Sequence, residues 1–163
     1  MKKLFLVFGL AISTLVILSN ASAQVPVTAN PAHEILLASA DAHLAANKRL
    51  VYDFWREVLE AGHMELADKY LTEGYVQHNP NVATGRAGFV ALFSKISKPA
   101  SIQARVQAPL VNIVAEGDLV ILSFVQGGTD PADASKKYTT TWFDMFPVEG
   151  GKIAEHWDPA KKC

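Results

Sequence analysis

The chain has 163 residues, with 15 lysines and arginines against 16 aspartates and glutamates. This length allows one domain, or one domain with a short appendage. The net charge of −1 gives no reason to expect nucleic acid as a partner. The single cysteine excludes an intramolecular disulfide, and it excludes any zinc site with two or more cysteine ligands.

The first 23 residues have the pattern of a cleavable secretory signal peptide. Lys2 and Lys3 precede an apolar run over residues 4–18, and the segment that ends at Ala23 reads Ala-Ser-Ala, a small-residue pattern that signal peptidase accepts. The apolar run is shorter than the ~20 residues that a membrane-spanning helix needs. We therefore predict cleavage after Ala23, a secreted or periplasmic protein, and no membrane contact after cleavage.

The mature chain begins with a leader and continues as one domain. Two prolines within residues 24–32 predict a flexible leader, and residues 33–163 are expected to form a single domain. The domain opens with a helical pattern that runs to Gly62, a residue type suited to ending a helix. An apolar stripe at the helix period covers residues 50–59, and Asn47 is the expected N-cap.

Short helices and then strands follow in the predicted order. One helix is expected over residues 65–71, and another begins after Thr84, which we place as an N-cap. From residue 102 onward the apolar positions alternate or run uninterrupted, as in strands. The predicted strands cover residues 102–108, 119–125, 138–148 and 152–158. Helices followed by strands predict an α+β fold, with helices on one face of a curved antiparallel sheet and a pocket between them.

The last two predicted strands carry Trp142, Asp144, His156 and Asp158, and the turn between the strands decides whether these side chains meet. A two-residue turn places Asp144 and Asp158 on opposite faces of the sheet, whereas a three-residue turn places all four side chains on one face. The double glycine of the turn favours the three-residue form. A buried Asp144 either pairs with Arg105 or a lysine, or stays poorly partnered and suited to proton transfer.

A second polar cluster lies between two predicted helices. It has the sequence Tyr75-Val76-Gln77-His78-Asn79-Pro80-Asn81. Asx turns account for Asn79 and Asn81, whereas turn chemistry does not require His78. Imidazole is the usual proton carrier in enzymes, so His78 is either a functional or a structural histidine. The sequence has neither a spacing typical of metal ligands nor a glycine-rich phosphate loop, so no metal and no nucleotide is expected.

Both clusters resemble motifs of the SnoaL-like branch of the nuclear-transport-factor-2-like superfamily. The resemblance covers residues 46–160, and the motifs that carry it are Tyr75 to Asn81, Thr84 to Arg86 with Phe89, Trp142 to Phe146, Gly151 to Ile153, and Glu155 to Asp158. It implies a cone-shaped α+β fold. In that fold, helices close one side of a strongly curved antiparallel sheet around a deep apolar cavity.

The resemblance also implies a type of chemistry. The polyketide cyclase that gives the family its name catalyses an intramolecular aldol condensation without metal or cofactor, and its acid/base aspartate corresponds to Asp158. A cavity histidine of that cyclase falls at Asp144 and a cavity glutamine falls at Trp142, so this chain departs from the cyclase at both positions. His78 lies in the segment that supplies a polar cavity residue in the family.

These observations lead to one functional prediction and one alternative. We predict an exported protein that performs cofactor-independent acid/base chemistry, of the aldol, isomerase or lyase type, on a small apolar carbonyl compound. Asp158 would abstract a proton, while His78 or a protonated Asp144 would hydrogen-bond the enolate oxygen. The expected pocket residues are Trp55, Tyr75, Asn79, Phe93, Trp142 and His156. The alternative is a non-enzymatic binding protein for a small hydrophobic ligand. The resemblance also suggests a homodimer through the outer sheet face.

Overall fold

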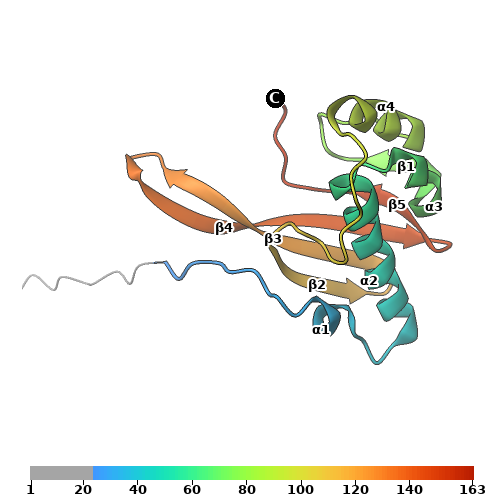
Figure 1. Cartoon of the computed structure of the whole chain (residues 1–163), viewed down its shortest axis with the longest axis horizontal. Helices are drawn as coiled ribbons and strands as arrows, with labels where there is room; N and C mark the ends of the chain where they lie inside the picture. Colours follow the sequence, from blue (N-terminus) through green and yellow to red (C-terminus); the bar gives the residue numbers. More distant parts are fainter. Residues whose placement is uncertain (1–23) are drawn as a thin grey trace, which may run out of the picture.

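The computed structural model describes residues 24–163, so the predicted signal peptide lies outside the described residues. Five strands form one curved, unclosed sheet in the order β1-β5-β4-β3-β2, with helices packed against it (Figure 1). The predicted α+β class is confirmed. The pair of β1 and β5 is parallel, whereas we predicted antiparallel pairing throughout. The strands are β1 (Leu71–Gln77), β2 (Leu110–Glu116), β3 (Leu119–Asp130), β4 (Asp133–Glu149) and β5 (Lys152–His156).

The helical region before β1 consists of several short pieces. After the five-residue α1 (His33–Leu37), the helix α2 (Ala42–Phe54) continues without a break as the π-helix η1 (Trp55–Glu60). The 3-10 turn η2 (Met64–Leu66) then leads into α3 (Ala67–Tyr70). The wider π-helical turn places Trp55 and Leu59 toward the interior cavity described below. Such π-helical segments are rare and occur frequently at functional sites.

Two predicted helix caps are wrong. The N-cap of α2 is Asp41, whose carboxylate accepts hydrogen bonds from the amides of His43 and Leu44, while Asn47 is buried inside the helix. The helix α4 (Arg86–Ile96) begins after Gly85 rather than after Thr84. The hydroxyl of Thr84 accepts a hydrogen bond from the amide of Gln77. The side chain of Asn47 contacts His43 of the same helix and donates to the carbonyl of Gly117, whereas Thr84 bonds the end of β1.

Phe54 lies at the centre of the core. Its ring contacts Tyr70, Phe89 and Phe146 at centroid distances of 5.9, 5.9 and 6.1 Å. These contacts join the C-terminal end of α2 to α3, α4 and β4, so one buried ring connects three helices with the sheet. Aromatic pairs at these separations add about 0.5–1.5 kcal/mol each beyond the burial of their area.

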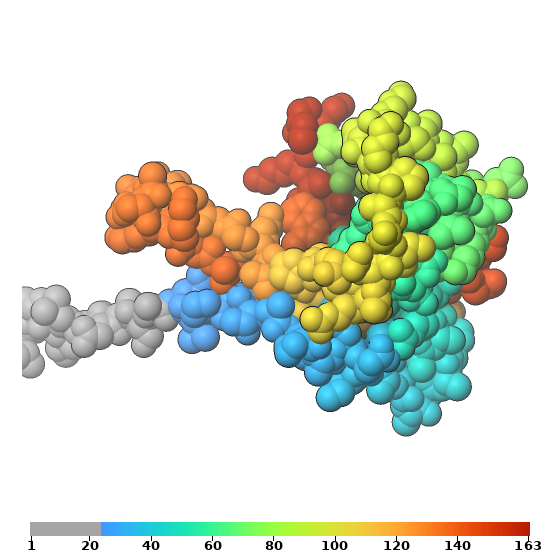
Figure 2. All heavy atoms as spheres, viewed as in Figure 1, coloured from blue at the N-terminus to red at the C-terminus, as the bar shows by residue number. Residues whose placement is uncertain are grey.

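The segment 97–109 is a loop, not the strand that we predicted over residues 102–108. Its backbone amides are satisfied by side chains of the helices rather than by a neighbouring strand. The carboxylate of Glu60 accepts from the amides of Gln107 and Ala108, both at 2.8 Å. The hydroxyl of Tyr52 accepts from the amide of Val106 at 2.9 Å. Of the alternating apolar residues only Val106 is buried, whereas Ile102 and Ala104 are exposed. Figure 2 shows the loop in yellow across the outer side of the helices.

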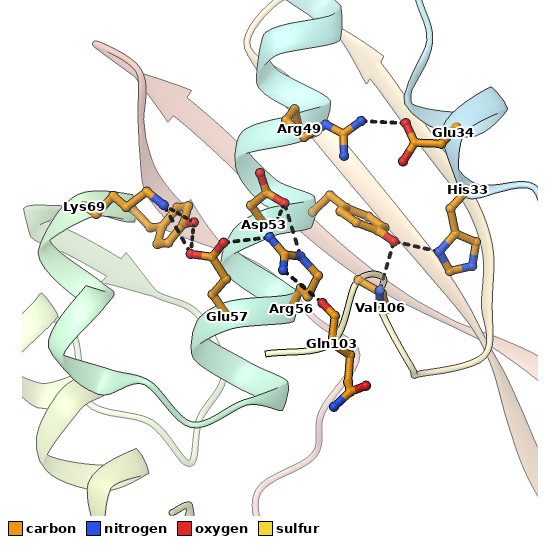
Figure 3. A network of polar contacts seen from close by, with 11 residues as sticks. His33, Glu34, Arg49, Asp53, Arg56, Glu57, Lys69, Gln103 and Val106 are labelled. Carbon is orange, nitrogen blue, oxygen red and sulfur yellow. Dashed lines mark hydrogen bonds and ion pairs between the residues drawn. The ribbon is translucent and has the colours of Figure 1, made fainter. Parts of the chain in front are cut away.

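Tyr52 also connects the loop to α1 through its contacts with Val106 and His33, two residues that are labelled in Figure 3. Its oxygen lies 2.8 Å from Nδ1 of His33. Burial, together with the charge of Arg105, lowers the pKa of His33. The neutral imidazole can therefore accept a hydrogen bond from the hydroxyl of Tyr52. One turn further along, Arg56 of η1 donates to Asp53, Glu57 and the carbonyl of Gln103.

The β3–β4 hairpin extends beyond the body of the domain (Figures 1 and 2). The leader runs alongside it: Gln24 donates to the carbonyl of Thr139, and the amide of Val27 donates to the hydroxyl of the same residue. Among the described residues, no helix has the length and hydropathy needed to cross a membrane.

We predict that Tyr52→Phe lowers the free energy of unfolding by about 1–3 kcal/mol, because it leaves the buried amide of Val106 and the ring nitrogen of His33 without a partner. The exposed Tyr138 provides the matched control, and Tyr138→Phe is expected to change the same quantity by less than about 0.5 kcal/mol. Urea denaturation followed by circular dichroism measures both. Equal stability of the two variants would contradict the role given to the Tyr52 hydroxyl.

Candidate active site

An apolar cavity of about 280 Å³ lies between the helices and the inner face of the sheet. One side is formed by α2, η1 and α4, and the other by the last residues of β1 together with β4 and the chain at the end of β5. Aromatic rings dominate its walls, and its few polar side chains come from β1, β4 and the end of the chain. The lining residues are Phe54, Trp55, Leu59, Tyr75, Gln77, Asn79, Val82, Phe89, Phe93, Asp144, Phe146, His156 and Asp158.

The turn between β4 and β5 has two residues, so the predicted three-residue turn is wrong. Glu149 pairs with Lys152, and both intervening glycines have positive φ, at 56° and 74°. Positive φ at both central residues is the requirement of a type I′ turn, which glycine meets at no steric cost. This turn alone would place Asp144 and Asp158 on opposite faces.

A β-bulge reverses that outcome. Val148 pairs with Ile153, but Met145 pairs with Trp157, so two residues of β4 face three of β5. The N–H of Val148 points to β3 and that of Met145 points to β5. The nitrogen of Pro147 therefore faces β5, where proline cannot donate. The extra residue moves the register by one, which puts Asp144, His156 and Asp158 on the same inner face.

Asp144 and His156 form a buried pair. The Nε2 atom of His156 lies 3.0 Å from Oδ1 of Asp144, and the two side chains are only 11% and 4% exposed. The ring of Phe146 stacks on the imidazole at 4.8 Å. The other oxygen, Oδ2 of Asp144, has no hydrogen-bond partner among the described residues. A buried carboxylate oxygen without a partner is costly, and this one belongs to a side chain that lines the cavity.

Asp158 is held at the same polar end by two N–H donors. Its Oδ2 accepts from the side-chain amide of Asn79 at 2.7 Å, and its Oδ1 accepts from the backbone amide of Ala160 at 2.9 Å. Each carboxylate oxygen has a second lone pair. The carboxylate is therefore fixed in position while it can still accept a proton from a molecule in the cavity.

Tyr75 brings a hydroxyl to the cavity wall. Its side chain is buried, and burial, together with the negative charges of Asp158 and Asp144, raises the pKa of this phenol above its usual range. The hydroxyl therefore keeps its proton. Its oxygen accepts a hydrogen bond from Gln77 at 3.3 Å, and the hydroxyl proton is then free to donate.

A family profile of the SnoaL-like domain matches residues 51–156. The chain belongs to the SnoaL-like family. This result confirms the resemblance found in the sequence, and it explains the combination of a curved sheet, covering helices and an apolar cavity.

Solved structures agree at the level of the fold. A candidate polyketide cyclase from Acidithiobacillus ferrooxidans superposes with a TM-score of 0.50 at 20% identity, over 74% of this chain and 89% of that one. TsrD from Streptomyces laurentii gives 0.47 at 23% identity, over 74% and 90% of the two chains. An LEH-like epoxide hydrolase from M. tuberculosis gives 0.48 at 18% identity, over 69% and 80%. No curated protein matches the chain.

Seven of the nine site residues expected for this SnoaL-like chain line the cavity: Trp55, Tyr75, Asn79, Phe93, Asp144, His156 and Asp158. The structure places the other two elsewhere. Trp142 lies one alternating position beyond Asp144, opposite Phe124 on β3, and is outside the lining. The structure shows where the seven lining side chains lie, and the functional roles given to them remain predictions.

His78 faces away from the cavity, so the prediction that it would bond a substrate oxygen there is wrong. Its Nε2 lies 2.9 Å from a carboxylate oxygen of Glu155, and its ring stacks on Trp157 at 4.5 Å. The reason is the alternation of side chains at the end of β1. Gln77 and Asn79 point to the cavity, and His78 between them points to the other side.

Gln77 is the polar cavity residue that the sequence analysis missed. Its Oε1 lies 2.8 Å from Nδ1 of His156. The signal was present in the sequence, because Gln77 and Asn79 follow Tyr75 at intervals of two residues, the period of one strand face. The prediction ranked side chains by chemical type, which favoured the imidazole over the neighbouring amide.

The three charged or ionisable groups at the polar end do not fit a metal site well. Asp144, His156 and Asp158 each offer a ligand atom, and these atoms lie within 4.8 Å of one another. However, the nitrogen of His156 that faces the carboxylates is already hydrogen-bonded to Asp144, and both oxygens of Asp158 accept N–H donors. The arrangement is that of a hydrogen-bonded network.

We predict that the contributions of Asp144 and His156 to the free energy of unfolding are coupled. Asp144→Leu and His156→Phe are each expected to lower the free energy of unfolding, because each leaves a buried partner unpaired. The double variant removes both polar groups, so its loss is expected to fall short of the sum of the single losses by about 1 kcal/mol or more. Urea denaturation of the four proteins measures this. Additive losses would show that the pair does not interact.

Proposed function

We propose that the protein catalyses proton transfer on a small neutral carbonyl compound, with Asp158 as the general base. One observation carries the proposal: a carboxylate fixed by two N–H donors stands at the polar end of a cavity that is otherwise aromatic and apolar. A base that is fixed in position needs little reorganisation to take a proton from a bound molecule. Membership in the SnoaL-like family is consistent with an enzyme of this type.

When Asp158 removes the proton, an enolate forms, and its oxygen needs a hydrogen-bond donor. Tyr75 supports this role, because its hydroxyl keeps its proton and points from a buried position on the cavity wall. The Asp144–His156 pair offers a second donor when Asp144 is protonated on Oδ2, the oxygen without a partner, while Oδ1 accepts from Nε2 of His156. These two groups replace His78 in the scheme expected from the sequence. A neutral carboxylic acid and a tyrosine together can stabilise an enolate in an apolar site.

The charge of the lining restricts the substrate. No lysine or arginine lines the cavity, whereas two aspartates do. An anionic substrate would bury a further negative charge without a cation, at a cost of several kcal/mol. A volume of about 280 Å³ and aromatic walls favour a compact molecule with flat rings. The related structures include candidate polyketide cyclases, whose assigned activity fits a substrate with ring carbonyls.

We predict that the protein accelerates exchange of the α-protons of 2-tetralone, a neutral bicyclic ketone, in deuterated water. Asp158→Asn is expected to lower the exchange rate by about 10²–10⁴-fold, the range of general acid–base assistance. Proton NMR of the ketone measures the loss of the α-proton signal. Asp68 is exposed and remote from the cavity, so Asp68→Asn provides the matched control with an unchanged rate.

The same experiment separates the enzyme from the binding protein. Full activity of Asp158→Asn would refute the role of this aspartate. Binding of the ketone without accelerated exchange, in both the original and the variant protein, would favour the alternative of a carrier. Titration of the tryptophan fluorescence with the ketone detects such binding, because Trp55 lines the cavity.

We further propose that the protein is exported with loss of residues 1–23. The support is the sequence alone: a basic start, an apolar run and an Ala-Ser-Ala site. N-terminal sequencing of the protein from its native host is expected to begin at Gln24. A chain that retains Met1 or residues of the apolar run would contradict this proposal.

A further inference from the structure

One amide side chain contacts both proton-carrying groups of the site. Gln77 lies between His156 and Tyr75 and bonds to each of them through a different atom. We infer that Gln77 is a positioning residue that sets the direction of proton donation in the cavity: it holds the His156 proton on Nδ1 and turns the Tyr75 hydroxyl proton toward the substrate. This inference rests on the proposed proton-transfer function.

The orientation of the Gln77 amide is fixed by the backbone. The N–H of Asn79 donates to Oε1 of Gln77 at 3.0 Å. A backbone N–H can only donate, so the atom that faces it must be the amide oxygen and not the NH₂ group. The tight turn after β1 therefore determines which end of the Gln77 amide faces which neighbour.

This orientation determines the state of His156. The same oxygen, Oε1, lies 2.8 Å from Nδ1 of His156, and an oxygen with no proton can only accept. Nδ1 must therefore carry a hydrogen. Nε2 then faces Oδ1 of Asp144, and one proton is shared between these two atoms. Without Gln77, a neutral imidazole could place its single hydrogen on Nε2 and donate it to Asp144, and Nδ1 would then carry no hydrogen.

The other end of the amide determines the direction of the Tyr75 hydroxyl. The NH₂ group of Gln77 donates to the tyrosine oxygen at 3.3 Å. The hydroxyl proton cannot point at a group that is itself donating, so it points away from Gln77. Because Tyr75 lines the cavity and has no other hydrogen-bond partner among the described residues, its proton is available to an oxygen of a bound molecule.

The sheet register places these groups together. β1 and β5 run parallel, with Gln77 paired to His156 and the N–H of His78 donating to the carbonyl of His156. The side chains of Gln77 and His156 are therefore neighbours on the same sheet face. The contact therefore follows from the backbone register of the fold.

The first experiment determines which ring nitrogen of His156 carries a hydrogen. Nitrogen-15 NMR of the imidazole side chains is expected to show a hydrogen on Nδ1 of His156 in the original protein and its loss in Gln77→Leu. The matched control is Gln126→Leu, at an exposed glutamine of the β3–β4 hairpin, which should leave the His156 signals unchanged. The His156→Phe variant assigns these signals by their disappearance.

A second variant separates the two tasks of Gln77. A glutamate at this position still offers an acceptor to His156 but has no NH₂ group for Tyr75. Gln77→Glu is therefore expected to keep the hydrogen on Nδ1 while it lowers kcat for 2-tetralone exchange, by on the order of 10²-fold, with a smaller change in KM. Gln77→Leu is expected to lower kcat at least as much.

The outcomes distinguish this inference from the proposed function. A hydrogen that stays on Nδ1 in Gln77→Leu, in a folded protein, overturns the inference even if exchange is fast. Activity of Gln77→Glu equal to that of the original protein overturns the part that concerns Tyr75. Absence of exchange in the original protein refutes the proposed function, but the NMR result for His156 would stand independently.

Discussion

The site depends on a missing hydrogen bond at Pro147. This proline lies in a central strand, and its nitrogen faces β5, where every other residue type would donate to the ladder. The bulge opposite it adds one residue to β5 and moves the register by one position. Without the bulge, the two-residue turn would direct Asp144 and Asp158 to opposite faces. One backbone constraint therefore brings the two carboxylates into the same cavity.

The helical wall of the cavity is held by polar contacts on its outer side. Tyr52, Arg56 and Glu60 bond to backbone atoms of the loop 97–109, which lies across the helices (Figure 2). The same helix directs Phe54, Trp55 and Leu59 inward. The outer contacts satisfy backbone groups of a long loop, and the inner face of the helices contributes no charged or ionisable side chain to the cavity lining. Polar chemistry is thus confined to the opposite wall, formed by the sheet.

The sequence predicted the fold better than it predicted the site. Helical periodicity and the order of helices before strands gave the α+β class, and the motifs gave the family, because both follow from local patterns that survive in the folded chain. The face shared by Asp144 and Asp158 was predicted correctly, but from the wrong turn. The bulge depends on pairing between strands, and a single sequence contains no direct signal for it apart from Pro147 itself.

The errors at His78 and in the loop 97–109 have a common physical cause. The sequence analysis recognised the alternation in residues 102–108 but not the one around His78, and in both places the segment that each face would contact was not known. His78 alternates with Gln77 and Asn79, and the imidazole lies on the face of Trp157 rather than in the cavity. Val106 alternates with polar neighbours because it packs under helix α2, where Tyr52 replaces a strand as the partner of its amide.

Oδ2 of Asp144 is a buried carboxylate oxygen without a hydrogen-bond partner among the described residues, and this lowers the stability of the fold. The fold satisfies Oδ1 with His156 and both oxygens of Asp158 with N–H donors, so the neighbourhood has the means to satisfy carboxylates. It leaves one buried oxygen without a donor, at a cost of about 1–3 kcal/mol. A leucine at this position would avoid that cost, but it would leave Nε2 of the buried His156 without its partner, which is why Asp144→Leu is expected to lower the free energy of unfolding. Oδ2 belongs to a side chain that lines the cavity, so it presents an acceptor without an internal donor, and this is the kind of local inconsistency that folds keep at functional sites.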